Sequence, residues 1–298
     1  MRSRVSSYVG IGIAVGFTSA ALWCASCSLT TSLDGLTNGA GGDAAMTSGN
    51  EAGAADGNVT GEAATADVSA GEGGSPASAY RAAVLADAPL AYWRLGEAAG
   101  AKTAKDETGN GHDGAVAPEV VLGVGGGLGG DTNTAARFNG AAGNIAIGDI
   151  FRFDGVTSFT LEAWIRPTAP GGYGTVLGRD SDPNGYALFL TPSLGAGFER
   201  QRSGNDDFLT GPLVSTSSFT HLVATYDGSA MRLYVNGTLV QGPMVSTSIP
   251  GASSSFFIGA DTTGAADLFK GDIDEPAVYD HALSDTQILT HFTIGKGL

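Results

Sequence analysis

An alternation of apolar and polar side chains with a period of two dominates the chain from Thr157 onward. It begins in SFTLEAWIRP, residues 158–167, and recurs at short spacing in segments from YGTVLGR to LFKGDIDEPAVYD, with turn residues between them. Such alternation places successive side chains on opposite faces of a β-strand. Asn236-Gly237, between two such segments, favours a tight hairpin turn. Many short strands with few helices predict an all-β fold, a sandwich or a jelly roll in a single domain.

This domain is expected to span residues 79–298. Its first segment, AYRAAVLADAP, predicts a short helix that ends before Pro89, and LAYWRLGE after it is strand-like. NTAARFNG and NIAIGD interrupt a Gly-rich region as further strands. Near the end, Ser284 and Gln287 form a capping-box pattern that predicts a helix over SDTQILTHF.

Residues 27–78 predict a disordered, acidic tether. From Ser28 to Ser78 there is no Lys, Arg or aromatic residue, and single acids are spaced among Gly, Ala, Ser and Thr. Such a segment buries too little apolar surface to offset its ordering entropy. Roughly fifty residues of this kind span about 40 Å, enough to hold a domain clear of a membrane surface.

Residues 1–26 predict a secretory signal peptide, with two arginines, an apolar stretch and then small residues. The end of this segment resembles the lipobox of bacterial lipoproteins. Ala25 and Ser26 fill the small positions before Cys27, although Cys24 stands where that family usually has Leu. The resemblance implies lipid attachment at Cys27 and an exported lipoprotein whose domain faces the periplasm or the cell surface. An ordinary cleaved signal and an uncleaved anchor helix remain the alternatives.

Charge and cysteine content exclude several classes of function. The chain has a net charge of −15 and no cluster of Lys and Arg, which argues against a nucleic-acid partner. Both cysteines lie in the leader, so the mature domain has no disulfide and no Cys-based zinc site. The membrane is expected to be contacted only through the lipid anchor.

Several segments together resemble the laminin-G-like domains of the concanavalin A-like lectin/glucanase superfamily. They are SFTLEAWIRP, FTHLVATYDGSAMRLYVNGTLV, GDIDEPAVYDHALSDTQI, and APLAYWRLGE followed by DETGNGHDG. The resemblance covers about residues 78–292 and departs in the Gly-rich stretch 118–131. It implies a two-sheet antiparallel jelly-roll sandwich with sheets of six or seven strands, a binding module for a glycan or a protein, and often a structural calcium.

The resemblance also suggests where calcium would bind. Asp106 and Asn110 match the first half of the family's metal loop, and Asp274 matches the second half. Alternation places Ile273 toward the core and Asp274 outward, where it could meet the Asp106 loop, and oxygen ligands suit calcium. The alternative is that residues 106–111 form a turn held by Asx hydrogen bonds.

Catalysis has weaker support. Glucanases of this superfamily carry Glu-x-Asp-x-x-Glu on one strand. Here Asp272 and Asp274 share a face, as the first two acids of that pattern do, but Ala277 replaces the third acid. Glu275 is expected on the opposite face. The four histidines are scattered and no Gly-x-Ser-x-Gly elbow is present. We therefore expect no enzyme, with a glycoside hydrolase or lyase as the alternative.

Candidate ligand contacts are Trp164 on an outer sheet face and Arg200, Arg202 and Asn205 in a polar loop. The alternatives are a packing role for Trp164 and a solvated surface for the loop. The favoured function is an exported, lipid-anchored, non-catalytic module that recognises a glycan or an extracytoplasmic protein. A structural surface protein without a soluble ligand is a further alternative, because ligand choice depends on loop shape.

The lipobox interpretation makes a direct prediction. Cys27→Ser should abolish lipid labelling and leave the precursor uncleaved at that site, because the thiol of Cys27 is the acceptor. Metabolic labelling with a radioactive fatty acid measures this, and Cys24→Ser is the control that should still be labelled. Lipid on the Cys27→Ser protein would contradict the interpretation.

Overall fold

The structure, a computed structural model, describes residues 76–180, 184–203, 205–261 and 266–298. The predicted signal peptide, Cys27 and almost all of the tether lie outside these residues. The described elements belong to one contact unit, Asp67–Leu298. A fragment spanning residues 67–298 therefore keeps every described element. No helix among the described residues is long and apolar enough to cross a membrane.

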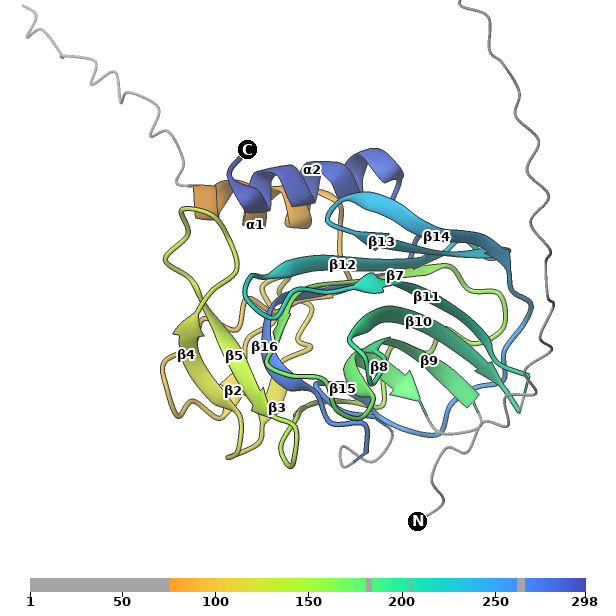
Figure 1. Ribbon diagram of the computed structural model, residues 1–298, viewed down its shortest axis with the longest axis horizontal. Helices are drawn as coiled ribbons and strands as arrows, with labels where there is room; N and C mark the ends of the chain where they lie inside the picture. Colours follow the sequence, from red (N-terminus) through yellow and green to blue (C-terminus); the bar gives the residue numbers. More distant parts are fainter. Residues whose placement is uncertain (1–75, 181–183, 204, 262–265) are drawn as a thin grey trace, which may run out of the picture. The chain divides into compact units, whose positions relative to one another are not determined.

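Two antiparallel sheets form a sandwich, which confirms the predicted fold class, although each sheet has eight strands where six or seven were expected (Figure 1). The first, the β7 sheet, has the order β14-β13-β12-β7-β16-β5-β4, with β1 also paired to β16. Its strands are β14 (Thr238–Val245), β13 (Ala230–Val235), β12 (Thr220–Tyr226), β7 (Phe159–Pro167), β16 (Lys270–Tyr279), β5 (Thr134–Asn139), β4 (Val121–Gly125) and β1 (Ala91–Tyr92).

The second, the β9 sheet, has the order β11-β10-β9-β8-β15-β6-β3-β2. Its strands are β11 (Asp207–Leu213), β10 (Gly195–Arg202), β9 (Asn184–Leu190), β8 (Gly174–Asp180), β15 (Phe256–Ile258), β6 (Ile145–Gly148), β3 (Gly114–Val116) and β2 (Thr103–Ala104). In Figure 1, β8 to β11 curve around the side of this sheet that faces away from the helices.

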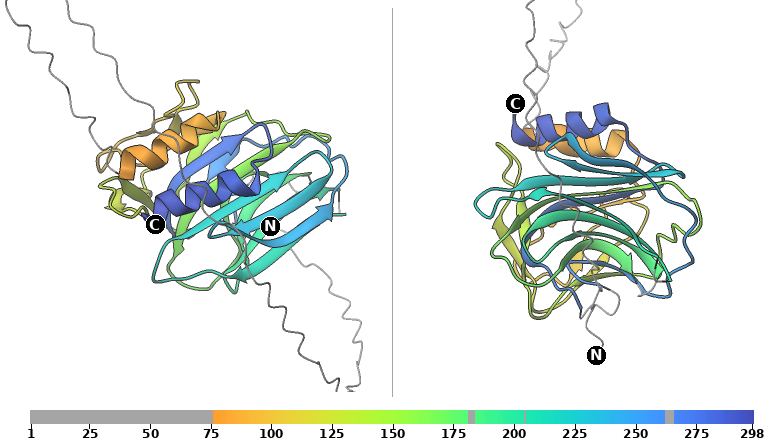
Figure 2. Two further views of the ribbon diagram at one scale, coloured as in Figure 1. Left: turned by 90° about the horizontal axis from the view of Figure 1, so that it is seen from above. Right: turned by 45° about the vertical axis from the view of Figure 1, so that its right-hand side comes forward.

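Helices α1 (Pro76–Ala86) and α2 (Asp285–Lys296) lie side by side across the outer face of the β7 sheet (Figure 2). The capping box predicted at Ser284 and Gln287 is present. Helix α1 begins three residues before the predicted domain start, and its end before Pro89 is as expected.

Alternation in the strands divides the buried residues between two layers. On β7, Phe159, Leu161 and Ile165 pack between the sheets in the main core, whereas Trp164 packs on the other face against the helices. The second layer also holds Tyr80 of α1. The β7 sheet is therefore buried on both faces, which explains why its central strands contain so few exposed residues.

Two local features differ from the predictions. The strand expected over LAYWRLGE is only Ala91–Tyr92, because Leu95 takes a positive φ of 54° and turns the chain. The Gly-rich stretch contains β4, and its loop passes close to neighbours: a Cβ on Gly127 would lie 2.8 Å from the ring of Phe219. The glycines there allow close approach rather than forming a linker.

One buried carboxylate joins the helices to the sheet. Glu162 of β7 accepts hydrogen bonds from Tyr80 of α1 at 3.1 Å, His221 at 2.8 Å and Tyr279 at 2.9 Å. Nδ1 of His291, on α2, lies 3.1 Å from both carboxylate oxygens. Burial alone would raise the pKa of Glu162, but the two histidines outweigh it and hold that pKa well below its usual range.

The pKa of His291, which contacts this carboxylate, shifts in the opposite direction. Burial alone would lower the pKa of His291, but the charge of Glu162 and its hydrogen bond raise it. A lowered carboxyl pKa stabilises the fold above about pH 4.5, and a raised histidine pKa stabilises it below about pH 6.5. The contribution of Glu162 and His291 to the free energy of unfolding should be largest between these two pH values. It should decrease below pH 4.5 and above pH 6.5.

We predict that Glu162→Gln lowers the free energy of unfolding by about 3 kcal/mol, because it removes one partner of a buried charged pair. Urea unfolding of the 67–298 fragment measures this, and the loss should be largest between about pH 4.5 and 6.5. The control is Glu119→Gln, at an exposed position, which should change stability by less than about 0.5 kcal/mol. An equal effect of both substitutions would contradict the role assigned to Glu162.

Candidate ligand-binding face

Asp106, the first predicted calcium ligand, is occupied by its own loop. Its Oδ1 accepts hydrogen bonds from the backbone N–H groups of Tyr92 and Thr108 and from the Thr108 hydroxyl, and its Oδ2 accepts one from the N–H of His112. The Asn110 amide donates to the carbonyl of Leu90. This is the Asx-turn arrangement weighed against the metal loop, and these hydrogen bonds use oxygens that a calcium site would need as ligands.

Asp274, the third predicted ligand, lies on the helix-facing side of β16 but is only 1% exposed. Its Oδ2 accepts from the N–H of Gly127, at the Gly-rich stretch, and its Oδ1 has no hydrogen-bond partner. Among the described residues no group of three or more His, Cys, Asp or Glu side chains could hold a metal ion. Calcium binding stays a prediction.

A bulge in β16 places a second carboxylate beside Asp274. The register shifts between Asp274 and Ala277, and Glu275 takes a φ of 52°. Simple alternation put Glu275 on the opposite face, but it bonds to the hydroxyl of Tyr92 and to Arg94, on the helix-facing side. A single extra residue in a bulge reverses the side-chain direction.

Burial and mutual repulsion shape the titration of these two acids. Burial raises the pKa of Asp274 well above its usual range, and the charge of Glu275 adds to the rise. Burial raises the pKa of Glu275 to about 7, against the opposing hydrogen bonds and charge of Arg94. The pair therefore destabilises the fold as both acids ionise at rising pH.

The remaining carboxylates of GDIDEPAVYD have structural or solvated positions. Asp272 accepts hydrogen bonds from Arg137 at 2.6 Å and from Arg166 at 2.7 Å. Asp280 is exposed beside His281. Asp272 therefore has a hydrogen-bonding role, and Asp280 lies in solvent.

The predicted ligand contacts do not form one surface. Trp164 is fully buried under the helices, where its Nε1 donates to Tyr80, so its burial favours the packing role. Arg200 is buried and lies 3.5 Å above the ring of Tyr226. Arg202 pairs with Asp207, and only Asn205 is fully at the surface.

The outer face of the β9 sheet carries a different set of side chains. On β10, Ala196 and Phe198 belong to the core, so Gly197, Glu199 and Gln201 point outward. The same parity on β8, β9, β11 and β15 defines an outward set, the β9 face: Thr175, Gly178, Asp180, Gly185, Ala187, Phe189, Gly197, Glu199, Gln201, Phe208, Thr210 and Phe257.

Register arranges this face in rows across the strands. One row runs Phe208–Glu199–Ala187–Gly178–Phe257, so one acid and two small residues lie between two outward aromatic side chains. Phe208 is 45% exposed. A floor of small residues between aromatic rings suits a flat ligand such as a sugar ring.

The neighbouring rows differ in character. On one side, the ring of Phe189 lies over Gly197 and contacts Tyr173 at 5.9 Å between centroids. On the other side, the Nε2 of Gln201 donates to Oδ2 of Asp180 at 3.1 Å. The β9 face therefore has an aromatic end and a polar end.

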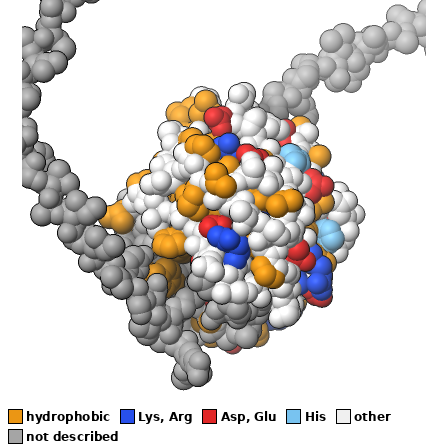
Figure 3. Space-filling view, turned by 90° about the vertical axis from the view of Figure 1, so that its right-hand side faces the viewer, with side chains coloured by type: hydrophobic (Ala, Val, Ile, Leu, Met, Phe, Trp, Pro, Cys, Tyr) orange, Lys and Arg blue, Asp and Glu red, His pale blue; other side chains and the backbone are white. Residues whose placement is uncertain are grey.

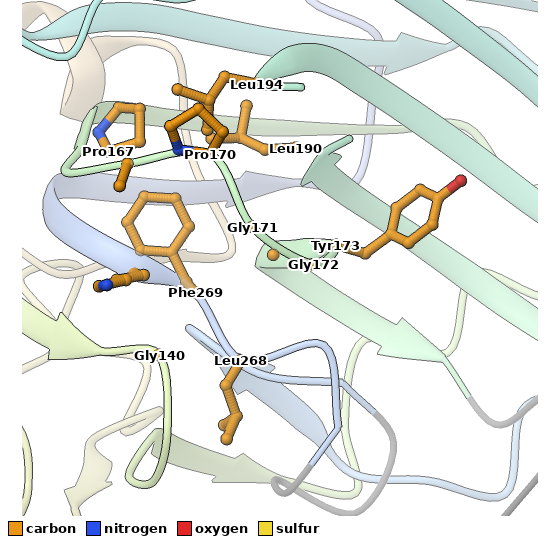
Figure 4. Close-up of a pocket in the computed structure, with 13 residues that line it drawn as sticks. Gly140, Pro167, Pro170, Gly171, Gly172, Tyr173, Leu190, Leu194, Leu268 and Phe269 are labelled. Atoms are coloured by element: carbon orange, nitrogen blue, oxygen red, sulfur yellow. The ribbon is translucent and has the colours of Figure 1, made fainter. Parts of the chain in front are cut away.

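A small pocket adjoins the aromatic end (Figure 4). Its volume is about 170 Å³, and Tyr173, Leu190, Leu194 and Phe269 are among the residues that line it. Tyr173 belongs both to this pocket and to the ring contact with Phe189. The pocket is too small for a whole drug-sized ligand and could extend the face by a single group.

None of the twelve outward residues of the β9 face is Lys or Arg. On another side of the molecule, Figure 3 shows basic side chains in isolated groups beside acidic ones. Sequence reasoning selected Arg200 and Arg202 and missed Glu199 and Gln201. The signal was available, because the apolar residues Ala196 and Phe198 fix the parity of β10.

We predict that Asp274→Asn raises the free energy of unfolding at pH 8 by about 1 kcal/mol or more, since one unit of raised carboxyl pKa corresponds to about 1.4 kcal/mol. The gain should shrink as the pH falls to about 4 and vanish below the unfolded-state pKa of about 3.9, where the wild-type acid is protonated in both states. Urea unfolding in EDTA measures it, with the exposed Asp280→Asn as control. If EDTA instead destabilises the wild type and Asp274→Asn removes that effect, Asp274 binds a cation.

Two solved structures with TM-scores above 0.5 agree with this fold, and a third is similar at a lower score. The binding domain of Paraclostridial Mosquitocidal Protein 1 matches with a TM-score of 0.53 and 16% identity, over 69% of this chain and 52% of that one. Trypanosoma rangeli sialidase in complex with sialic acid matches with a TM-score of 0.51 and 17% identity, over 69% of this chain and 33% of that one. The third structure is domain 4 of AbnA, a GH43 extracellular arabinanase from Geobacillus stearothermophilus, in complex with arabinotriose. It has a TM-score of 0.48 and 23% identity, over 68% of this chain and 97% of that one.

At these identities the likeness concerns the fold. A comparison with curated proteins finds no match. The family model described as the concanavalin A-like lectin/glucanases superfamily matches residues 139–289, which is half of the chain. The chain therefore belongs to the concanavalin A-like lectin/glucanases superfamily.

Proposed function

We propose that this protein is an exported, lipid-anchored, non-catalytic module that binds a glycan on the β9 face. The observation that carries the proposal is the row in which Glu199, Ala187 and Gly178 lie between the aromatic side chains of Phe208 and Phe257. Aromatic rings present apolar faces to sugar rings, while carboxylate and amide groups at the polar end can bind hydroxyls. The lectin-like fold supports the proposal.

The leader and the tether complete the proposal. A lipid on Cys27 followed by a flexible tether holds the domain at a distance from the membrane, where it can reach glycans outside the cytoplasm. The membrane is contacted through the lipid alone. A protein ligand remains an outcome of the binding experiment below.

The β16 acids support binding rather than hydrolysis. Asp272 is held by Arg137 and Arg166, and Ala277 stands where the glucanase pattern Glu-x-Asp-x-x-Glu would have its third acid.

We predict that the 67–298 fragment binds at least one oligosaccharide on a glycan array and hydrolyses none. Phe208→Ala should weaken that binding by threefold or more, since one aromatic contact contributes about 0.5–1.5 kcal/mol. Isothermal titration measures the affinity, and reducing-sugar release measures hydrolysis.

The matched control is Leu289→Ala on α2, an exposed apolar residue outside the β9 sheet, which should leave affinity unchanged. Binding that Phe208→Ala does not affect would move the site away from the β9 face. Turnover lost in Glu199→Gln would show an enzyme, and capture of a protein with no glycan bound would replace the glycan as ligand.

A further inference from the structure

Three cationic side chains lie together on the outer face of the β7 sheet, at the end of β16 that the helices leave exposed. In the register of this sheet, Asp272 of β16 is level with Arg137 of β5 on one side and with Arg166 of β7 on the other. Lys270 comes two residues before Asp272, so strand alternation directs it to the same face. We call these four residues the arginine row.

The arginine row is positive in a chain that is strongly negative. Its two guanidinium groups share one carboxylate, since Arg137 donates to Asp272 at 2.6 and 3.1 Å and Arg166 donates to it at 2.7 and 3.1 Å. Among the described residues, the exposed Lys270 has no ion pair. Three cations against one carboxylate leave a net charge of +2, whereas the whole chain has −15.

Both arginines keep hydrogen-bond donors that Asp272 does not use. A guanidinium carries five N–H groups, and each arginine gives Asp272 only those of its Nε and one of its Nη2. The side chains of Arg137 and Arg166 are 49% and 30% exposed, so the remaining N–H groups are open to a ligand. Asp272 is buried between them and holds the two guanidinium groups in place.

Neighbouring side chains fix the ends of the row. The guanidinium of Arg166 lies 4.6 Å from the centre of the Phe219 ring, and the Gly-rich loop passes close to that ring at Gly127. At the other end, Val121 of β4 is level with Arg137 and is 53% exposed. The cations are therefore presented from rigid strands, beside an exposed apolar side chain.

The chemistry of the row selects an oxyanion. A guanidinium presents parallel N–H groups that match two oxygens of a carboxylate, sulfate or phosphate. A membrane surface is a poorer match, because lipid-binding segments contain about four to eight Lys and Arg, whereas this row has three with an acid between them. The net charge of −15 repels a nucleic acid. A glycan that carries single acidic groups meets neither objection.

We propose that the arginine row is a second binding site, at which Arg137, Arg166 and Lys270 hold a carboxylate or sulfate group of an acidic glycan. The site lies on the other sheet from the β9 face. The inference therefore goes beyond the proposed function and does not rest on it.

Isothermal titration of the 67–298 fragment with oligogalacturonate, sulfated cellohexaose and neutral cellohexaose tests the site. At least one acidic probe should bind, and raising NaCl from about 0.05 M to about 0.5 M should weaken it, because exposed charges are screened. Lys270→Gln should weaken the acidic probe by about threefold, as expected for one exposed ionic contact. Arg137→Gln should weaken it by about fivefold or more, because a charge-assisted fork is lost.

The matched control is Lys102→Gln, which removes the same charge at another exposed lysine and should leave the affinity unchanged. Lys270→Gln breaks no ion pair among the described residues, so it should melt like the wild type and keeps the test decisive if Arg137→Gln is unstable. Acidic binding that Lys270→Gln leaves unchanged would overturn the site.

The remaining outcomes separate this site from the β9 face and from other ligands. Acidic binding that is lost in Phe208→Ala but kept in Lys270→Gln would place acidic glycans on the β9 face and overturn the second site. Binding of phosphatidylglycerol vesicles or polyglutamate in place of both acidic probes would overturn the ligand class, and no binding of either acidic probe would overturn the inference. Neutral binding lost only in Phe208→Ala, with acidic binding lost only in Lys270→Gln, would support both sites.

Discussion

The buried carboxylate of Glu162 holds both helices on the β7 sheet, and the helices cover much of the outer face of that sheet. A fully buried charge is stable only when hydrogen-bonding partners surround it, and here the partners come from α1, α2, β12 and β16. These contacts fasten both helices onto the β7 sheet and bury Trp164 beneath them. The β7 sheet is thus a two-sided core layer, and the part of its outer face beneath the helices is not a surface for a ligand.

The two sheets consequently have different roles. The β7 sheet holds the buried acids, including Asp274 and Glu275 beside the Gly-rich loop, and carries the stability and pH response of the domain. The β9 sheet keeps its outer face away from the helices, with a small-residue floor, aromatic flanks and the Gln201–Asp180 pair. The site is proposed where the strands already provide rigid positions, rather than in a loop.

Much of this fold follows from periodicity, and much of the candidate site does not. Alternation along β7 correctly predicted that Leu161 and Trp164 face opposite layers, but which layer meets solvent depends on where α1 and α2 pack. The bulge at Glu275 breaks the period of two without any marker in the pattern. Gln201 could have been placed on the outer face from its position next to Phe198, whereas its pairing with Asp180 requires the strand register.

The central claim is that the β9 face is the binding surface. Titrating the isotope-labelled 67–298 fragment with the neutral oligosaccharide that binds it most tightly, and following backbone amide chemical shifts, tests this directly. The account predicts that the largest shifts fall on β8, β9, β10 and β11, with the side-chain amide of Gln201 among them, and that α1 and α2 stay unchanged. Shifts concentrated instead in α2 or in the loop from Asp106 to His112 would contradict it.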